Sequence, residues 1–373
     1  MSKRLVVCCD GTWNTPDQTT DGKPTPTNVA KVAMALASHG ADGREQRLFY
    51  HRGVGTTRSD RLLGGAFGAG LFRDVCETYR FVVQNYEEGD ELFFFGFSRG
   101  AYTARSTAGL IRNSGVLHRD NADQIQQAYA LYRAGNQNTN PRSVAAALFR
   151  KMYSCEPEIR FIGVWDTVGA LGIPSVGGWL ARQFNKRYEF HDTTLSSRVG
   201  EAYQALAIDE RRGPFVPTIW SRSDMAPPQQ LLEQVWFAGA HSDVGGGNAD
   251  HGLSDIALCW MLEKARGAGL VFVDSAFQPG VFPGDPTTLV DIVDAYTRID
   301  PNPAQAAENS RKGIYRFLPP HSREGGKGGN EYIASTVCRQ ERSRGWWKAP
   351  VPDNDPEGRV VQIAVGNDLT RVS

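Results

Sequence analysis

Residues 92–101 read Leu92-Phe93-Phe94-Phe95-Gly96-Phe97-Ser98-Arg99-Gly100-Ala101. The four apolar residues at the start predict a strand that is buried on both faces, and the small residues at 101–111 predict a helix after it. Between them stands the pattern G-x-S-x-G. In so sharp a strand-to-helix turn, the two glycines relieve crowding of the backbone and leave the Ser98 hydroxyl at the edge of the sheet. This context indicates a nucleophile, and the alternative is a glycine-rich turn whose serine caps the helix.

Strands and helices alternate along most of the chain. Apolar runs predict further strands at 5–9, 48–50, 159–164 and 234–237, and helical spacing of apolar residues predicts helices at 28–38, 71–86, 122–133, 144–151 and 254–265. This alternation predicts an α/β fold with a mostly parallel central sheet flanked by helices, and with helical and loop insertions. Residues 172–230 show weak periodicity, and the part after about residue 300 is predicted to be loop. We expect one domain over residues 1–373.

The composition is that of a globular chain, with 40% hydrophobic and 22% charged residues among 373. Because 41 Lys and Arg balance 41 Asp and Glu, the chain lacks the basic surplus of a nucleic-acid-binding protein. Six cysteines, two of them adjacent, indicate a reduced intracellular chain rather than a disulfide framework. The apolar run at 5–9 is too short for a signal peptide, and no stretch approaches the roughly 18 apolar residues of a membrane span. The sequence therefore predicts a soluble, cytoplasmic protein.

Chemically suggestive residues follow the predicted strands, and in a parallel sheet the carboxyl ends of the strands carry the functional loops. The chain order Ser98, Asp166, His241 is that of the α/β-hydrolase triad, in which the imidazole takes the serine proton and the aspartate holds its tautomer. A histidine paired in this way should titrate at about 6 to 8. Asp243 is the rival of Asp166, and His251 is the rival of His241. The structural alternatives are a histidine bonded to backbone carbonyls and an aspartate that caps a helix.

An oxyanion hole needs two backbone N–H groups that point at one position. Arg99, directly after the serine, is expected to supply the first. Gly11-Thr12, after the first predicted strand, is expected to supply the second, with Asp10 holding that loop in place. The alternative for this loop is an Asx-turn without a catalytic part.

A metal site is a further alternative, because His241-x-Asp243, Asp250-His251 and Asp10 offer nitrogen and oxygen ligands. The chain contains no HExxH, CxxC or DxDxDG pattern beside them. The glycine loops at 53–55 and 64–70 match neither the P-loop nor the dinucleotide-binding motif. We therefore expect neither metal nor cofactor, and metal-assisted hydrolysis through the His241–His251 loop stays an alternative.

Five blocks of the chain resemble the signature motifs of one family: Asp10-Gly11-Thr12-Trp13-Asn14, Gly96-Phe97-Ser98-Arg99-Gly100-Ala101, Val164-Trp165-Asp166-Thr167-Val168, Ala205-Leu206-Ala207-Ile208-Asp209-Glu210-Arg211 and His241-Ser242-Asp243-Val244-Gly245-Gly246-Gly247. Over residues 6–265 the chain resembles the catalytic domain of Tle1-like type VI secretion phospholipase effectors. The resemblance implies an α/β-hydrolase fold and a triad of Ser98, Asp166 and His241 that cleaves phospholipid acyl esters through an acyl-enzyme.

The same resemblance implies a lipid or other acyl-ester substrate and peripheral contact with a membrane. It also implies export as an effector without a signal peptide, and a secretion-system or immunity protein as partner. A different class of function stays open, in which a catalytically silent member of the fold binds a lipid or a partner through the same cleft.

Overall fold

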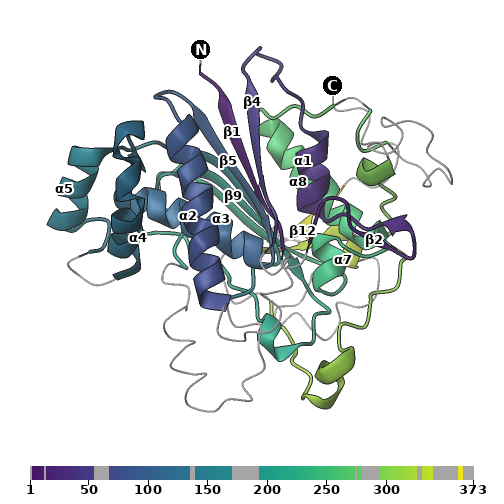
Figure 1. Ribbon diagram of the computed structural model, residues 1–373. Helices are drawn as coiled ribbons and strands as arrows, with labels where there is room; N and C mark the ends of the chain where they lie inside the picture. Colours follow the sequence, from purple (N-terminus) through teal and green to yellow (C-terminus); the bar gives the residue numbers. More distant parts are fainter. Residues whose placement is uncertain are drawn as a thin grey trace.

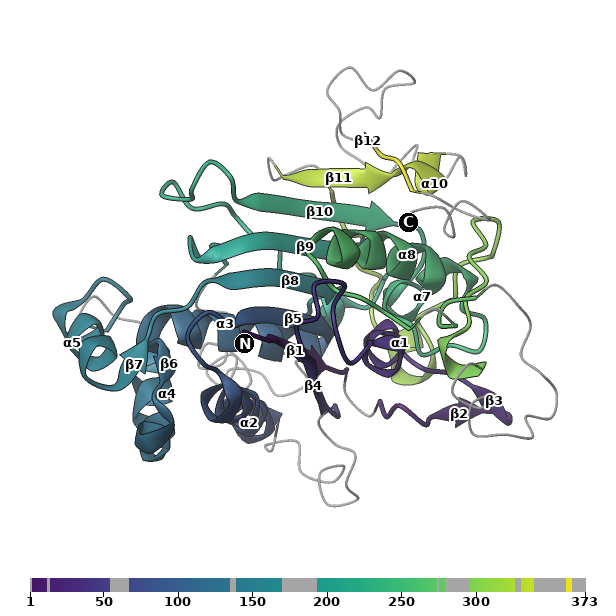
Figure 2. The same ribbon diagram turned by 90° about the horizontal axis from the view of Figure 1, so that it is seen from above.

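The computed structural model describes residues 2–11, 14–53, 67–134, 139–169, 193–273, 275–278, 295–325, 330–338 and 360–363. Within these residues a single large sheet has the strand order β12-β11-β10-β9-β8-β5-β1-β4, and every neighbouring pair is parallel (Figures 1 and 2). Its strands are β1 (Arg4–Cys9), β4 (Gln46–His51), β5 (Glu91–Phe97), β8 (Ile159–Trp165), β9 (Val199–Ala207), β10 (Leu231–Phe237), β11 (Glu331–Ala334) and β12 (Val360–Val361). The predicted α/β fold with a mostly parallel sheet is confirmed.

Helices cover both faces of this sheet. One face carries α1 (Asn28–Ala35) and α8 (Gly252–Gly267), and the other carries α2 (Phe67–Asn85) and α3 (Arg99–Ser114) (Figure 1). Alternate residues of the central strands face the two layers: in β5, Phe93 and Phe95 join the core under α1 and α8, whereas Leu92 and Phe94 join the core under α2 and α3. Burial on both faces explains why these strands are uninterrupted apolar runs.

A small insertion lies between α3 and β8, on the side of the sheet where the strands begin (Figure 2). It consists of η1 (Arg119–Gln124), α4 (Ile125–Ala134) and α5 (Val144–Tyr153), with the antiparallel pair β6 (Val116–Leu117) and β7 (Ser154–Cys155). A second antiparallel pair joins β2 (Thr19–Thr20) to β3 (Lys23–Pro24). No helix among the described residues is long and apolar enough to cross a membrane.

The strand order reverses its direction between β1 and β5. From β1 the chain moves to β4 on one side, and it then returns through α2 to β5 on the other side. Ligands of open α/β sheets bind at such a reversal, outside the carboxyl ends of the strands. Asp10 and Gly11 follow β1 there, and Ser98 follows β5.

Two parts of the sequence interpretation need correction. β9 lies inside residues 172–230, where the weak periodicity predicted no element, because polar residues such as Glu201 and Gln204 break its apolar run. The region after residue 300, predicted to be loop, contains η3 (Gly313–Phe317), β11 and α10 (Ser335–Cys338). β11 pairs with β10 in a parallel register, and its four residues are too few to stand out as a pattern.

Candidate active site

The turn at Ser98 has the geometry of a nucleophile elbow. Ser98 lies between β5 and α3, at the N-cap position of the helix, and its φ of 57° is a left-handed conformation that is strained for a residue with a side chain. The flanking glycines are required by contact: a Cβ at Gly96 would lie 2.6 Å from the Ala101 Cα, and a Cβ at Gly100 would lie 2.1 Å from the Cys9 carbonyl oxygen. The turn is therefore pressed against the end of β1, and Ser98 is 7% exposed.

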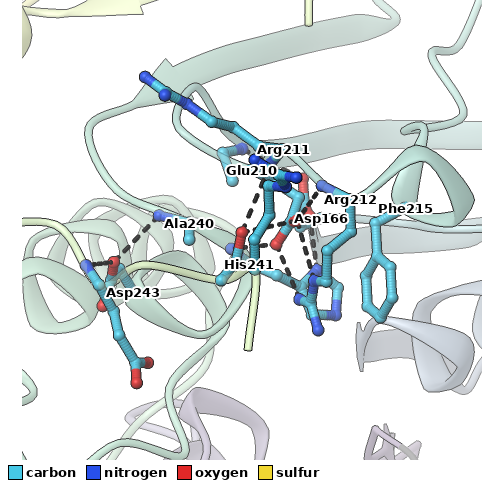
Figure 3. A network of polar contacts seen from close by, with 12 residues as sticks. Asp166, Glu210, Arg211, Arg212, Phe215, Ala240, His241 and Asp243 are labelled. Carbon is cyan, nitrogen blue, oxygen red and sulfur yellow. Dashed lines mark hydrogen bonds and ion pairs between the residues drawn. The ribbon is translucent and has the colours of Figure 1, made fainter. Parts of the chain in front are cut away.

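Asp166 and His241 come together at neighbouring strand ends. Asp166 directly follows β8 with a φ of 40°, and His241 opens the short helix α7 (His241–Gly245) shortly after β10. The imidazole Nδ1 lies 2.5 Å from the Asp166 Oδ2 (Figure 3). Both side chains are removed from water, because the residues are 0% and 5% exposed. This is the contact through which an aspartate fixes the tautomer of a catalytic histidine.

Phe97 links this pair to the serine turn. Its ring centroid lies 4.6 Å from that of His241, and a Cβ at Gly245 would lie 2.0 Å from the Phe97 ring. The phenyl ring is thus wedged between the imidazole and the backbone of α7. Since Ser98 directly follows Phe97, this packing connects the serine turn to the residue that contacts the imidazole.

The rival aspartate has a different task. Asp243 Oδ2 accepts hydrogen bonds from the backbone N–H of Ala240 at 3.0 Å and of Glu308 at 2.7 Å, and its Oδ1 accepts from the Asn248 amide. In Figure 3 it lies apart from the imidazole, on the far side of Ala240. Asp243 therefore caps α7 and ties it to the segment at 308, and the structure brings Asp166, not Asp243, to His241.

An arginine that the sequence analysis missed binds the same carboxylate. Arg323 Nη1 donates to Asp166 Oδ1 at 2.6 Å, and its Nη2 donates to Oδ2 at 2.9 Å. The guanidinium also donates to the carbonyl oxygens of Ala207 and Phe215, and Arg323 is only 4% exposed. A single arginine in a stretch without periodicity gives no sequence signal for such a contact.

Burial and charge act in opposite directions on the pair. Burial alone would raise the pKa of the Asp166 carboxyl, but the Arg323 charge and the hydrogen bond from His241 hold that pKa far below its ordinary range. For His241, burial lowers the imidazole pKa more than the contact with Asp166 raises it. The balance therefore lowers the pKa of His241 from its ordinary value of about 6.5 and favours the lower part of the range expected from the sequence.

Glu210 supports the histidine from the loop after β9. It is fully buried, accepts from the His241 backbone N–H at 3.3 Å, and forms an ion pair with Arg212 at 2.7 Å. The Arg212 guanidinium carbon in turn lies 3.6 Å from the centroid of the Phe215 ring. This ring packs edge-on against the His241 imidazole, with 5.0 Å between the ring centroids (Figure 3). Glu210 belongs to one of the motif blocks quoted above, but its spacing from the triad residues gave no hint of this role.

The loop after β1 differs from the expectation in one respect. Asp10 Oδ1 accepts the Gly11 N–H at 2.6 Å, while its Oδ2 accepts from the hydroxyl groups of Thr27 at 2.8 Å and Tyr50. Asp10 thus holds this loop against α1 and β4, as expected, and burial raises its pKa to about 6. The Gly11 N–H, however, is bound to that carboxylate instead of pointing at a substrate. Thr12 lies outside the described residues.

His251 is not a neighbour of His241 in any contact that the structure records. Its Nδ1 is paired with Asp255, whose other oxygen binds the Lys31 ammonium at 2.6 Å. Among the described residues, His, Cys, Asp and Glu side chains form no group of three or more that could hold a metal ion. The ligand set considered from the sequence is therefore not assembled in this part of the chain.

Comparison with known proteins identifies the family. Residues 3–264 match the family described as "T6SS, Phospholipase effector Tle1-like, catalytic domain". The chain belongs to this family. The resemblance deduced from the motif blocks is confirmed, and the Tle1-like match ends before the segment that contributes Arg323.

Individual relatives are more distant. Uncharacterized protein YEL023C of Saccharomyces cerevisiae is 26% identical over 293 residues, which cover 64% of this chain and 40% of the yeast protein. Two solved structures are each 19% identical to this chain. An uncharacterized protein from Pseudomonas aeruginosa has a TM-score of 0.46, and the match covers 80% of this chain and 49% of that chain. The Tle1 effector bound to the VgrG spike of the type VI secretion system has a TM-score of 0.35, and the match covers 66% of this chain and 52% of the effector chain. This Tle1-like chain spans about half or less of the length of each.

Proposed function

We propose that the chain hydrolyses carboxylic acyl esters of lipids, phospholipids included, with Ser98 as nucleophile, His241 as general base and Asp166 as its partner. The observation that carries this proposal is the buried contact of 2.5 Å between His241 Nδ1 and Asp166 Oδ2, beside a strained serine turn at the end of β5. The membership of the Tle1-like family supports the choice of a lipid ester as substrate.

The chemistry follows from the tautomer. Because Nδ1–H donates to Asp166, Nε2 is the nitrogen that accepts a proton. It takes the proton of the Ser98 hydroxyl while the Ser98 oxygen bonds to the acyl carbon. The alcohol part of the lipid leaves with that proton and an acyl-serine remains, which a water deprotonated by His241 then hydrolyses.

The oxyanion of each tetrahedral intermediate needs two N–H donors. We assign the first to the backbone N–H of Arg99, because Arg99 directly follows the serine and is the first residue of α3, where the amino end of a helix favours negative charge. We assign the second to Thr12 rather than Gly11, since the Gly11 N–H is bound to Asp10.

An exposed aromatic turn next to the site supports contact with a lipid surface. Phe317 in η3 is 87% exposed. Its neighbour Tyr315 lies 6.2 Å from the ring of Phe215, which itself contacts His241. Arg316, between the two aromatic residues, is exposed and adds a cation that suits anionic head groups. The family further leads us to propose export as an effector, with a secretion-system or immunity protein as partner.

The test is a panel of p-nitrophenyl acyl esters and defined phospholipids, with Ser98→Ala as the control. We expect release of carboxylic acid from the wild type and none above background from the variant. EDTA should leave the rate unchanged, because a serine triad needs no cation. A folded wild type that binds lipid vesicles but cleaves nothing would favour the silent binding protein, and strong inhibition by EDTA that one divalent ion reverses would favour metal-assisted hydrolysis.

A further inference from the structure

The Asp166 carboxylate is saturated with donors although it is completely buried. Oδ1 accepts from Arg323 Nη1 and from the Ala207 N–H at 3.1 Å, and Oδ2 accepts from Arg323 Nη2 and His241 Nδ1. The bidentate contact fixes the plane of the carboxylate, which a single histidine could not do. The carbonyl oxygens of Ala207 and Phe215 hold the guanidinium in turn, so its position is set by the end of β9 and by η2 (Gly213–Phe215).

We propose that Arg323 is a positioning residue of the reaction: it orients Asp166 toward His241 and supplies the positive charge that keeps the buried imidazole neutral at rest. This inference rests on the proposed function, because it concerns the same triad. It also gives the part of the chain beyond residue 264 a task in the active site, since the segment 295–325 delivers the arginine.

The charge balance around His241 explains the second role. Two carboxylates lie close to His241: Asp166, after β8, contacts the imidazole, and Glu210, after β9, accepts from the His241 backbone N–H. Each is paired with a guanidinium group, Asp166 with Arg323 from the C-terminal segment and Glu210 with Arg212 from the loop after β9. The four charges cancel. Without Arg323 the group would carry one uncompensated negative charge in a site with little water, and that charge would stabilise the imidazolium. The pKa of His241 would rise, and the base would be protonated over a wider pH range.

The experiment reads this pKa directly by NMR titration of ¹³C-labelled histidine in the full chain, with the His241 signal assigned from its absence in His241→Gln. Arg323→Gln keeps an amide donor and removes the charge, so we expect the His241 pKa to rise by about one unit or more, a tenfold change in proton affinity. Arg323→Lys keeps the positive charge but loses the two-pronged guanidinium contact. In this variant the pKa of His241 should stay within a few tenths of the wild-type value.

Arg4→Gln is the matched control. Arg4 is 6% exposed and holds Asp42 through two hydrogen bonds, but it lies at the amino end of β1, at the opposite end of the sheet. Its loss should leave the His241 titration unchanged. An unchanged pKa in folded Arg323→Gln, or equal shifts in the Gln and Lys variants, would overturn the proposal.

Folding and function are separated in the same set of variants. If Arg323→Gln does not fold, the double variant Asp166→Asn/Arg323→Gln is tested instead. We expect the double variant to fold, because it leaves no buried charge without a partner. Failure of the double variant to fold would show that the arginine acts through packing alone and would contradict the proposal. The titration needs no substrate. A wild type without esterase activity would therefore refute the proposed function and leave this measurement intact.

Discussion

The sharpest mutational prediction concerns Asp166→Asn. An asparagine places an NH₂ group where one of the two carboxylate oxygens now accepts hydrogen bonds, and each oxygen faces two donors. If the NH₂ takes the Oδ2 position, His241 must turn its Nδ1 into an acceptor and carry its proton on Nε2. That tautomer cannot accept the proton of Ser98, so kcat should fall about 10⁴-fold, or about 5.4 kcal/mol of activation barrier.

The same substitution removes the counter-charge of Arg323. A buried guanidinium without its carboxylate costs the folded state about 3–5 kcal/mol. Activity and stability must therefore be measured together, by ester hydrolysis at a temperature well below the transition and by urea unfolding of the same preparation.

Asp243→Asn serves as the comparison. An amide oxygen can still accept the two backbone N–H groups that now meet at Oδ2, so we expect a loss of about 1 kcal/mol in stability and less than a tenfold change in kcat. The reasoning would be refuted if folded Asp243→Asn lost as much kcat as Asp166→Asn, or more.

Three further outcomes follow from the site. The kcat/KM of the wild type should rise with pH as one group with a pKa below about 6.5 loses its proton, because the general base must be neutral and burial lowers the pKa of His241. A rise in kcat/KM centred above pH 7 would contradict this assignment. His251→Ala should keep that limb, whereas His241→Ala should lose it together with the activity, as a pH–rate series of both variants will tell. Gly100→Ala should lower the free energy of unfolding by at least about 1–3 kcal/mol in urea titration and abolish hydrolysis, since its Cβ would lie 2.1 Å from the Cys9 carbonyl oxygen; a stable, active variant would disprove the described turn.

Much of the fold and the core of the site could be predicted from the sequence, because both rest on local signals. A strand buried on both faces must be an apolar run, and a sharp strand-to-helix turn must contain small residues. The strand and the helix on either side of Ser98 could therefore be predicted. The chain order of Ser98, Asp166 and His241 then followed from the strand ends. The contact between Asp166 and His241 agrees with that expectation, whereas the roles of the three residues stay predictions.

What escaped the sequence analysis depends on contacts between distant segments. Arg323 meets Asp166 across 157 positions, and no spacing or periodicity marks one arginine among loop residues. The Gly11 N–H was expected to face the substrate, but it donates to the side chain of the preceding residue, Asp10. Residue order alone does not show whether such a backbone N–H binds a neighbouring side chain or stays available for a substrate. The sequence did not reveal β9 because polar residues interrupt its apolar run, among them Gln204, which forms a buried hydrogen bond with Arg105.

Covalent labelling tests the central claim most directly. A fluorophosphonate probe reacts with a serine that a neighbouring base activates, and the mass of the modified protein and of its peptides locates the site. The account predicts one phosphonyl group per chain on Ser98 in the wild type, no label in Ser98→Ala, and strongly slowed labelling in His241→Ala. Equal labelling of wild type and Ser98→Ala, or an unlabelled wild type that nevertheless cleaves esters, would contradict it.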